Sequence, residues 1–304
     1  MGYLRWRAVQ LLIAVWGIST VVFFLVRLSG DPLALYLSEQ STLEQRAELT
    51  RQLGFDSPLP VQYLRFLGQA ATGNFGISMR TGLPAMEMVF GRLGATLELS
   101  VAALLLAVVV GVPVGLIAAA RRDTLFDRFV MALAVVGQGV PSFLQGVLLI
   151  WLFSVEWHLL PVGGRGTVSH LVLPTLTLAT FSLARLARLT RSAVLEILGQ
   201  DFIRTAKAKG LGDRVVLYGH ALKNASIPIV TAIGLSFSVF FGSAVVTEVV
   251  FFWPGIGRLL VQSVGARDYP VVQAAVFVTA VFVTVANLVT DLAYLSLDPR
   301  IRYS

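Results

Sequence analysis

Long, nearly uncharged apolar runs recur along this chain. A bilayer core needs about 20 consecutive apolar residues per helix, and in lipid a spanning segment must satisfy its own backbone hydrogen bonds. Six runs approach or meet that length: residues 8–26, 99–120, 129–153, 171–190, 227–246 and 271–290. The sequence therefore predicts an all-α, polytopic membrane protein with six transmembrane helices.

The composition supports a membrane protein and argues against several other classes. Hydrophobic residues make up 56% of the 304 residues and charged residues only 13%, whereas an ordinary soluble domain carries roughly 25% charged residues. The net charge of +7 fits basic loops that stay in the cytoplasm, so we expect no nucleic-acid partner. Cysteine is absent, and His158, His170 and His220 lack the spacing of metal ligands, so we expect neither a disulfide nor a metal site.

The distribution of Lys and Arg predicts the orientation. With the N-terminus in the cytoplasm, 15 of the 24 basic residues fall on the cytoplasmic side and nine outside. Six of those nine lie between residues 27 and 92, and long segments weaken the positive-inside rule. The remaining comparison, 15 against three, predicts that both termini are cytoplasmic.

Three parts of the chain follow from this topology. Residues 1–28 form an N-terminal segment with the first transmembrane helix, which we interpret as a retained anchor because its apolar run is long for a cleaved signal peptide. Residues 29–94 form a polar extracytoplasmic region, with a short helix from Thr42 to Leu53 capped by Ser41 or Thr42. Residues 95–304 form a five-helix core.

Two glycine patterns lie within the predicted spans. Gly111 and Gly115 are four residues apart on one helix face, which favours close helix packing over a role in binding. Gly137, Gly139 and Pro141 interrupt the third run and could kink it beside a cavity.

The charged residues near the spans lie toward their ends: Glu98, Arg185, Arg188 and Asp291. No carboxylate falls in the middle of a predicted span, where ion-coupled carriers often place one. This weakens, without excluding, the alternative of a stand-alone ion-coupled secondary transporter.

Residues 196–226 form a patterned, basic loop between the fourth and fifth spans. Asp201 can cap a helix over 202–209, Gly210 can end it in the left-handed conformation, and Asp213 can cap a second helix over 214–224. Periodicity alone fits two interpretations equally well, a docking element for another protein or a hairpin that rests on lipid headgroups.

The loop resembles a known family. Residues 201–212 (DFIRTAKAKGLG) and 220–228 (HALKNASIP) resemble the cytoplasmic "EAA" loop of permease subunits in binding-protein-dependent ABC importers, particularly the dipeptide, oligopeptide and nickel branch. Four further stretches resemble that branch in order along the chain: residues 53–63, 73–78, 95–99 and 252–260. Arg204 and Thr205 stand where the general motif has Glu and Ala, so the role of that Glu is not transferred.

The resemblance implies a type I ABC importer permease fold in the bacterial inner membrane. It implies three kinds of partner: a homologous second permease, two cytoplasmic ATPases and an extracytoplasmic solute-binding protein. It assigns ATPase coupling to nine loop residues: Asp201, Phe202, Arg204, Thr205, Ala206, Lys207, Lys209, Gly210 and Leu211. Within this picture Ala206 is expected to face the ATPase.

We do not expect this chain to catalyse a reaction itself. It contains no G-x-x-x-x-G-K-[ST] phosphate-binding loop, so ATP and Mg²⁺ are expected on the partner ATPases and no cofactor on this chain. No arrangement of catalytic side chains is evident, which makes an intramembrane enzyme a remote alternative. Peptides are the leading solute, with nickel complexes, glutathione and sugars as alternatives; the sequence assigns no residues to the solute pathway.

Overall fold

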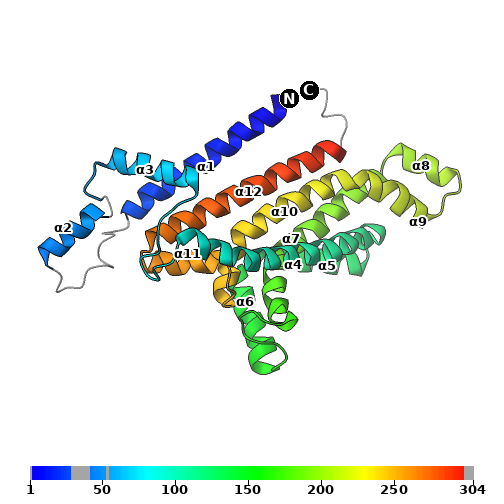
Figure 1. Cartoon of the computed structure of the whole chain (residues 1–304). Coiled ribbons are helices and arrows are strands. Elements are labelled where there is room, and N and C mark those ends of the chain that lie inside the picture. The colour runs from blue at the N-terminus through cyan, green and yellow to red at the C-terminus, as the bar shows by residue number, and fades with distance from the viewer. Residues whose placement is uncertain (1, 29–41, 53–54, 298–304) are drawn as a thin grey trace. The chain divides into compact units, whose positions relative to one another are not determined.

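The computed structural model describes residues 2–28, 42–52 and 55–297, and helices dominate this part of the chain (Figure 1). Near the N-terminus lie α1 (Gly2–Leu28), α2 (Leu43–Gln52) and α3 (Leu59–Thr72). The central helices are α4 (Ala85–Ala120), α5 (Leu125–Gly139), α6 (Ser142–Ile150), the π-helical turn η2 (Trp151–Glu156) and α7 (Val168–Leu198). The remaining elements are α8 (Asp201–Ala208), α9 (Asp213–Val215), the π-helical turn η3 (Val216–Ala221), α10 (Leu222–Val250), α11 (Ile256–Gly265) and α12 (Tyr269–Leu297).

Four helical segments are long and apolar enough to cross a membrane: α4, α7, the continuous stretch Asp213–Val250, and Tyr269–Thr290 of α12. The pair α5 and α6–η2 makes a fifth if it crosses as one broken span, and α1 contains a shorter apolar stretch, Leu12–Leu25. The all-α membrane fold is confirmed. The count of six spans and the cytoplasmic position of both termini stay predictions.

The predicted third span, 129–153, is not one helix. Its two halves, α5 and α6–η2, are bent by 103°, and the break falls between Val140 and Pro141. Proline lacks an N–H and disfavours helical geometry in the residue before it, and Val140 is indeed extended (φ −84°, ψ 127°). The Gln145 side chain supports the break, because its Nε2 donates to the carbonyls of Gly137 (3.0 Å) and Val140 (2.8 Å). The predicted kink is therefore confirmed.

The predicted boundary at residue 227 is wrong. A proline at the second residue of the run 227–246 predicts that Pro228 occupies the first turn of the fifth span. Instead, the second loop helix continues through η3 into α10, so Pro228 lies inside a helix. Ala221, Ala225 and Ile229 pack in one cluster with Leu116 and Val194. Their four-residue spacing forms one buried stripe that passes the proline, and this packing stabilises a continuous helix.

The predicted short helix before α3 is confirmed as α2. Thr42 caps it: the Gln45 N–H donates to the Thr42 hydroxyl (3.2 Å), and the Thr42 N–H donates to Gln45 Oε1 (3.0 Å). This is a reciprocal capping box. Ser41, Leu53 and the C-terminal tail from residue 298 lie outside the described residues.

The chain divides into two compact units. The first comprises residues 1–96 and 254–285. A chain of aromatic contacts links its helices: Phe23 of α1 lies 5.2 Å from Phe66 of α3, Phe66 lies 6.2 Å from Phe75, and Phe75 lies 5.1 Å from Phe277 of α12, measured between ring centroids. The buried Asp268 carboxylate accepts hydrogen bonds from the Ser78 hydroxyl (2.5 Å) and the Met79 N–H (3.1 Å), and so ties this turn to the start of α12.

The second unit comprises residues 97–253 and 286–304, and α7 is its central helix, in contact with α5, α6 and α10. A Cβ on Gly111 would lie 2.8 Å from the Leu183 carbonyl oxygen, and one on Gly115 would collide with the Ala187 carbonyl oxygen. The two glycines therefore serve close packing of α4 on α7, as predicted.

Candidate functional site

The loop singled out by the sequence begins with α8 (Figure 1). Gln200 is the N-cap residue, and Asp201 is the first helical residue without a capping hydrogen bond from its side chain, so the predicted cap at Asp201 is wrong. Its exposed carboxylate still lies at the positive end of the helix dipole, which is the favourable end for a negative charge.

The end of α8 follows the prediction. Gly210 adopts the left-handed conformation with φ +81°, which a residue with a Cβ adopts only at a steric cost. The Gly210 N–H donates to the Lys207 carbonyl (2.9 Å), and the Leu211 N–H donates to the Ala206 carbonyl (3.3 Å). These two bonds satisfy carbonyls that the helix end would leave unpaired.

The inward face of α8 packs against its own chain. Ile203, Ala206 and Val216 form a buried cluster, with Ile197 and Leu198 at the end of α7 packed against it. The Ala206 side chain is only 7% exposed. The expectation that Ala206 faces the ATPase is therefore wrong, because the small side chain instead allows α8 to lie close to η3.

The exposed side of α8 and the residues just after its end carry other loop residues that the sequence singled out. Phe202 is 41% exposed although it is a large apolar side chain, and Thr205, Lys209 and Leu211 are also exposed. Two ion pairs lie at the edge of this face, Arg204–Asp201 at 3.4 Å and Lys207–Asp213 at 3.3 Å. Exposed pairs of this kind contribute only about 0–1 kcal/mol, so they leave the charges available to a partner.

The base of the loop is closely packed. Below the α8 cluster, the cluster of Leu116, Val194, Ala221, Ala225 and Ile229 joins α4, α7, η3 and α10. Ile197 and Leu198 belong to the surroundings of both clusters. Packed side chains therefore connect α8 with α4, α7 and α10.

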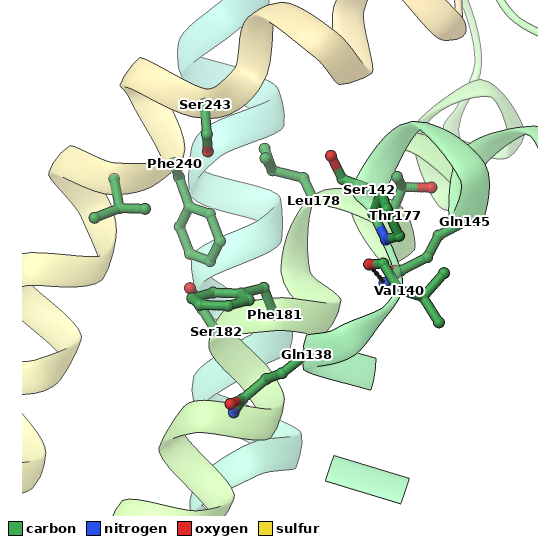
Figure 2. A pocket seen from close by; sticks show the side chains of 12 residues that line it. Gln138, Val140, Ser142, Gln145, Thr177, Leu178, Phe181, Ser182, Phe240 and Ser243 are labelled. Atoms are coloured by element: carbon green, nitrogen blue, oxygen red, sulfur yellow. Dashed lines mark hydrogen bonds between the residues drawn. The ribbon is translucent and has the colours of Figure 1, made fainter. Parts of the chain in front are cut away.

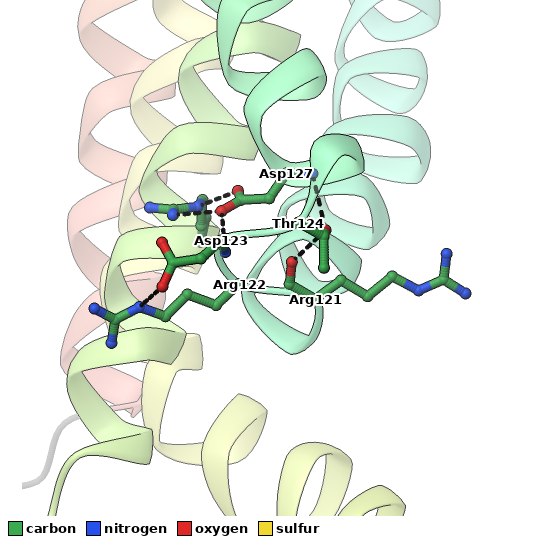
Figure 3. Close-up of polar contacts among 6 residues, drawn as sticks. Arg121, Arg122, Asp123, Thr124 and Asp127 are labelled. Carbon is green, nitrogen blue, oxygen red and sulfur yellow. Dashed lines mark hydrogen bonds and ion pairs between the residues drawn. The ribbon is translucent and has the colours of Figure 1, made fainter.

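A buried ion pair joins α5 to α7 (Figure 3). Arg191 binds Asp127 through two parallel hydrogen bonds, Nε to Oδ1 at 2.5 Å and an Nη to Oδ2 at 2.7 Å. The Asp123 N–H donates to the same carboxylate at 3.0 Å, and the Thr124 hydroxyl caps α5 by accepting from the Asp127 N–H at 3.4 Å. Asp127 was not predicted as a site residue, although Thr124 and Asp127 have the spacing of a capping box.

A cavity of about 350 Å³ lies within the second unit, between the α5–α6 break, α7 and α10 (Figure 2). The break contributes Gln138, Ser142 and Gln145, α7 contributes Ser182 among others, and α10 contributes Ser243. The sequence predicted a cavity beside the kink but none of these side chains.

Two charged residues that were expected near helix ends lie inside helices instead. Glu98 of α4 pairs with Arg165 at 2.6 Å, and Arg188 of α7 donates to Gln138 at 3.0 Å.

Comparisons with known proteins agree with this geometry. Residues 111–303 match the profile of the family described as binding-protein-dependent transport system inner membrane component. The chain belongs to this family. It is 39% identical to the dipeptide transport system permease protein DppB of Escherichia coli, over 94% of each chain. It is 40% identical to the glutathione transport system permease protein GsiC of Salmonella paratyphi A, over 100% of this chain and 99% of the relative.

The fold is also that of solved importer subunits. An inward-facing structure of the MetNI methionine ABC transporter matches with a TM-score of 0.60 and 19% identity, over 70% of this chain and 97% of that chain. This member of the inner membrane component family is thus a multi-pass protein of the bacterial inner membrane and a permease subunit of an ATP-driven importer. It is a transport protein and not an enzyme.

Proposed function

We propose that this permease forms half of a translocation pathway that imports peptides or related small solutes delivered by a binding protein. The support is that relatives which align over almost the whole chain are named for dipeptide and glutathione transport, and glutathione is itself a peptide. Nickel complexes and sugars are the alternative solutes.

The proposed assembly has four core subunits and a docking partner. A homologous second permease completes the pathway, two cytoplasmic ATPases hold ATP and Mg²⁺, and the binding protein docks outside, where residues 29–94 lie. Both termini face the cytoplasm, and lipid surrounds the five-helix core of residues 95–304. The alternative, a stand-alone ion-coupled secondary transporter, predicts uptake that needs no ATP.

The coupling loop, residues 196–226, is proposed to carry the ATPase motion to the membrane helices. The observation that supports this role is the division of α8 into two faces. Ala206 and the rest of the inward face hold the helix on its own chain, while Phe202, Thr205, Lys209 and Leu211 remain outside. An exposed phenylalanine is an effective anchor for a partner groove.

The remaining coupling residues have supporting roles in this proposal. Asp201 begins the helix and Gly210 ends it with the required backbone angle. Arg204 and Lys207 lie at the rim, where they attract a partner of opposite charge and influence association more than affinity. Removal of either rim charge alone is therefore expected to have a small effect.

The test is Phe202→Glu in the complete transporter, reconstituted in proteoliposomes with its ATPases, second permease and binding protein. A lost anchor of about 1.4 kcal/mol corresponds to a tenfold change, so we expect peptide uptake and solute-stimulated ATP hydrolysis to fall about tenfold or more. Leu125→Glu is the matched control, since Leu125 is also exposed and apolar but lies outside the loop; it should transport normally.

Two results would contradict the proposal. Uptake by Phe202→Glu equal to that of the wild type would remove the outward face of α8 from the coupling contact. Uptake by wild-type vesicles without ATP, driven by an imposed ion gradient, would support the stand-alone carrier instead.

A further inference from the structure

The cavity beside the α5–α6 break is lined by polar side chains from four helices, α5, α6, α7 and α10 (Figure 2). Polar groups within a membrane-spanning region are unfavourable unless they find partners. The structure records no hydrogen bond for the hydroxyls of Ser142, Ser182 and Ser243 within the described part of the chain. The three hydroxyl groups, on α6, α7 and α10, therefore line a space in which an apolar occupant would leave them without hydrogen-bond partners.

The two glutamines of the cavity have complementary unused groups. Both donors of the Gln145 amide are used, by the carbonyls of Gly137 and Val140, so its Oε1 remains as an acceptor. Gln138 is in the opposite state, because its Oε1 accepts from Arg188 at 3.0 Å and its NH₂ remains as a donor. These partners also fix the orientation of each amide.

One free NH₂ and one free carbonyl oxygen are the complement of a peptide group. The solute carbonyl can accept from Gln138, while the solute N–H donates to Gln145. We propose that this cavity is a solute-binding site of the translocation pathway, and that Gln138 and Gln145 bind the main-chain amide of a peptide. The proposal rests on the proposed function, since it assumes that the permease carries peptides.

The other residues that line the cavity can accommodate peptides of different sequence. Among the residues that line the cavity, all of them described, none carries a formal charge. Leu178, Phe181 and Phe240 provide apolar surface for side chains of different shapes. At about 350 Å³ the space is at the small end of ligand cavities, which span about 300–1,000 Å³. Neutral amide recognition without charge selection favours short peptides over metal ions, whose ligands would be carboxylates or imidazoles.

The test variant is Gln138→Glu in the complete reconstituted transporter. Glutamate has nearly the same shape and keeps an acceptor for Arg188, but its carboxylate has no N–H to donate. With dialanine as the probe and the loaded binding protein at saturation, uptake per ATP hydrolysed should fall about threefold to tenfold, the range for one lost hydrogen bond. Gln262→Glu, an exposed glutamine of α11, is the matched control and should transport like the wild type.

The cysteine-free chain allows a second measurement that needs no transport. Alkylation of Ser243→Cys by a small neutral maleimide, in the presence of ATP and vanadate, should slow at least threefold when dialanine-loaded binding protein replaces the empty form. Val246→Cys, on the same helix but outside the cavity, should react at one rate in both conditions.

The outcomes separate the two proposals. If wild-type transporter takes up dialanine but Gln138→Glu loses less than twofold, or if alkylation at residue 243 is unchanged, the binding site is refuted and the peptide permease stands. If the wild-type transporter fails to take up dialanine and other dipeptides while ATP hydrolysis responds to a different solute, the peptide function is refuted together with the site.

Discussion

Replacement of Asp127 by asparagine tests whether the buried ion pair holds α5 against α7. The Asp127 side chain is 3% exposed and that of Arg191 is 24% exposed. Removal of one partner of a buried ion pair costs about 3–5 kcal/mol, because the other charge is left unpaired. Since Arg191 retains some access to solvent, we expect a lower loss, about 2–4 kcal/mol.

The matched control lies four residues earlier in the same turn. Asp123 pairs with Arg122 at 3.2 Å, but these side chains are 74% and 66% exposed, so Asp123→Asn should cost only about 0–1 kcal/mol. Asparagine also tolerates the left-handed conformation that Asp123 adopts, with φ 64°. The two variants thus make the same chemical change and differ mainly in burial.

The assay heats purified transporter that carries a fluorescent tag on this permease, and measures the fraction that remains monodisperse on size-exclusion chromatography. A loss of 1 kcal/mol lowers the midpoint of a 150–250-residue unit by about 2–4 °C. Asp127→Asn should therefore lose roughly 4–16 °C, and the double variant Asp127→Asn, Arg191→Met should lose less than the sum of the two single changes. Equal midpoints for Asp127→Asn and Asp123→Asn would refute the reasoning.

Gly115→Val should lower the midpoint of thermal unfolding by several degrees, since the new side chain would collide with the Ala187 carbonyl oxygen. The control Gly91→Val, where the added side chain meets open space, should lower the midpoint by about 3 °C or less. Equal losses would contradict the packing of α4 on α7. Asp268→Ala leaves two donors unpaired and should cost about 1–3 kcal/mol in the same assay; an unchanged midpoint would show that the turn does not depend on it. Ser57→Cys should react with an impermeant thiol reagent in intact cells; reaction only after the membrane is opened would refute the predicted topology.

The membrane fold could be predicted because the main criterion, the length of an apolar run, is a property of consecutive residues. A long apolar run favours a helix in lipid because its backbone hydrogen bonds must be made within the protein, and the predicted runs 99–120, 171–190 and 271–290 lie inside α4, α7 and α12. The helix ends were less predictable. α4 begins at Ala85 and α7 extends to Leu198, since packed helices continue beyond their apolar stretch.

Parts of the candidate site were also local. Gly210 could be assigned to a left-handed helix end, because its freedom at positive φ is a property of the residue itself. The break at Pro141 could be expected for the same kind of reason, since proline removes a donor and restricts its neighbour. Both features could be recognised in a few consecutive residues.

The direction of each functional side chain depended on tertiary structure. Ala206 points inward because Val216 and the end of α7 are there to cover it. Arg191 binds Asp127, which lies 64 positions away in the sequence, and Arg188 donates to Gln138, which lies 50 positions away. Hydrogen bonds and van der Waals contacts act over a few ångströms, so which groups become partners, and which amide ends remain free in a cavity, is decided only when distant helices pack together.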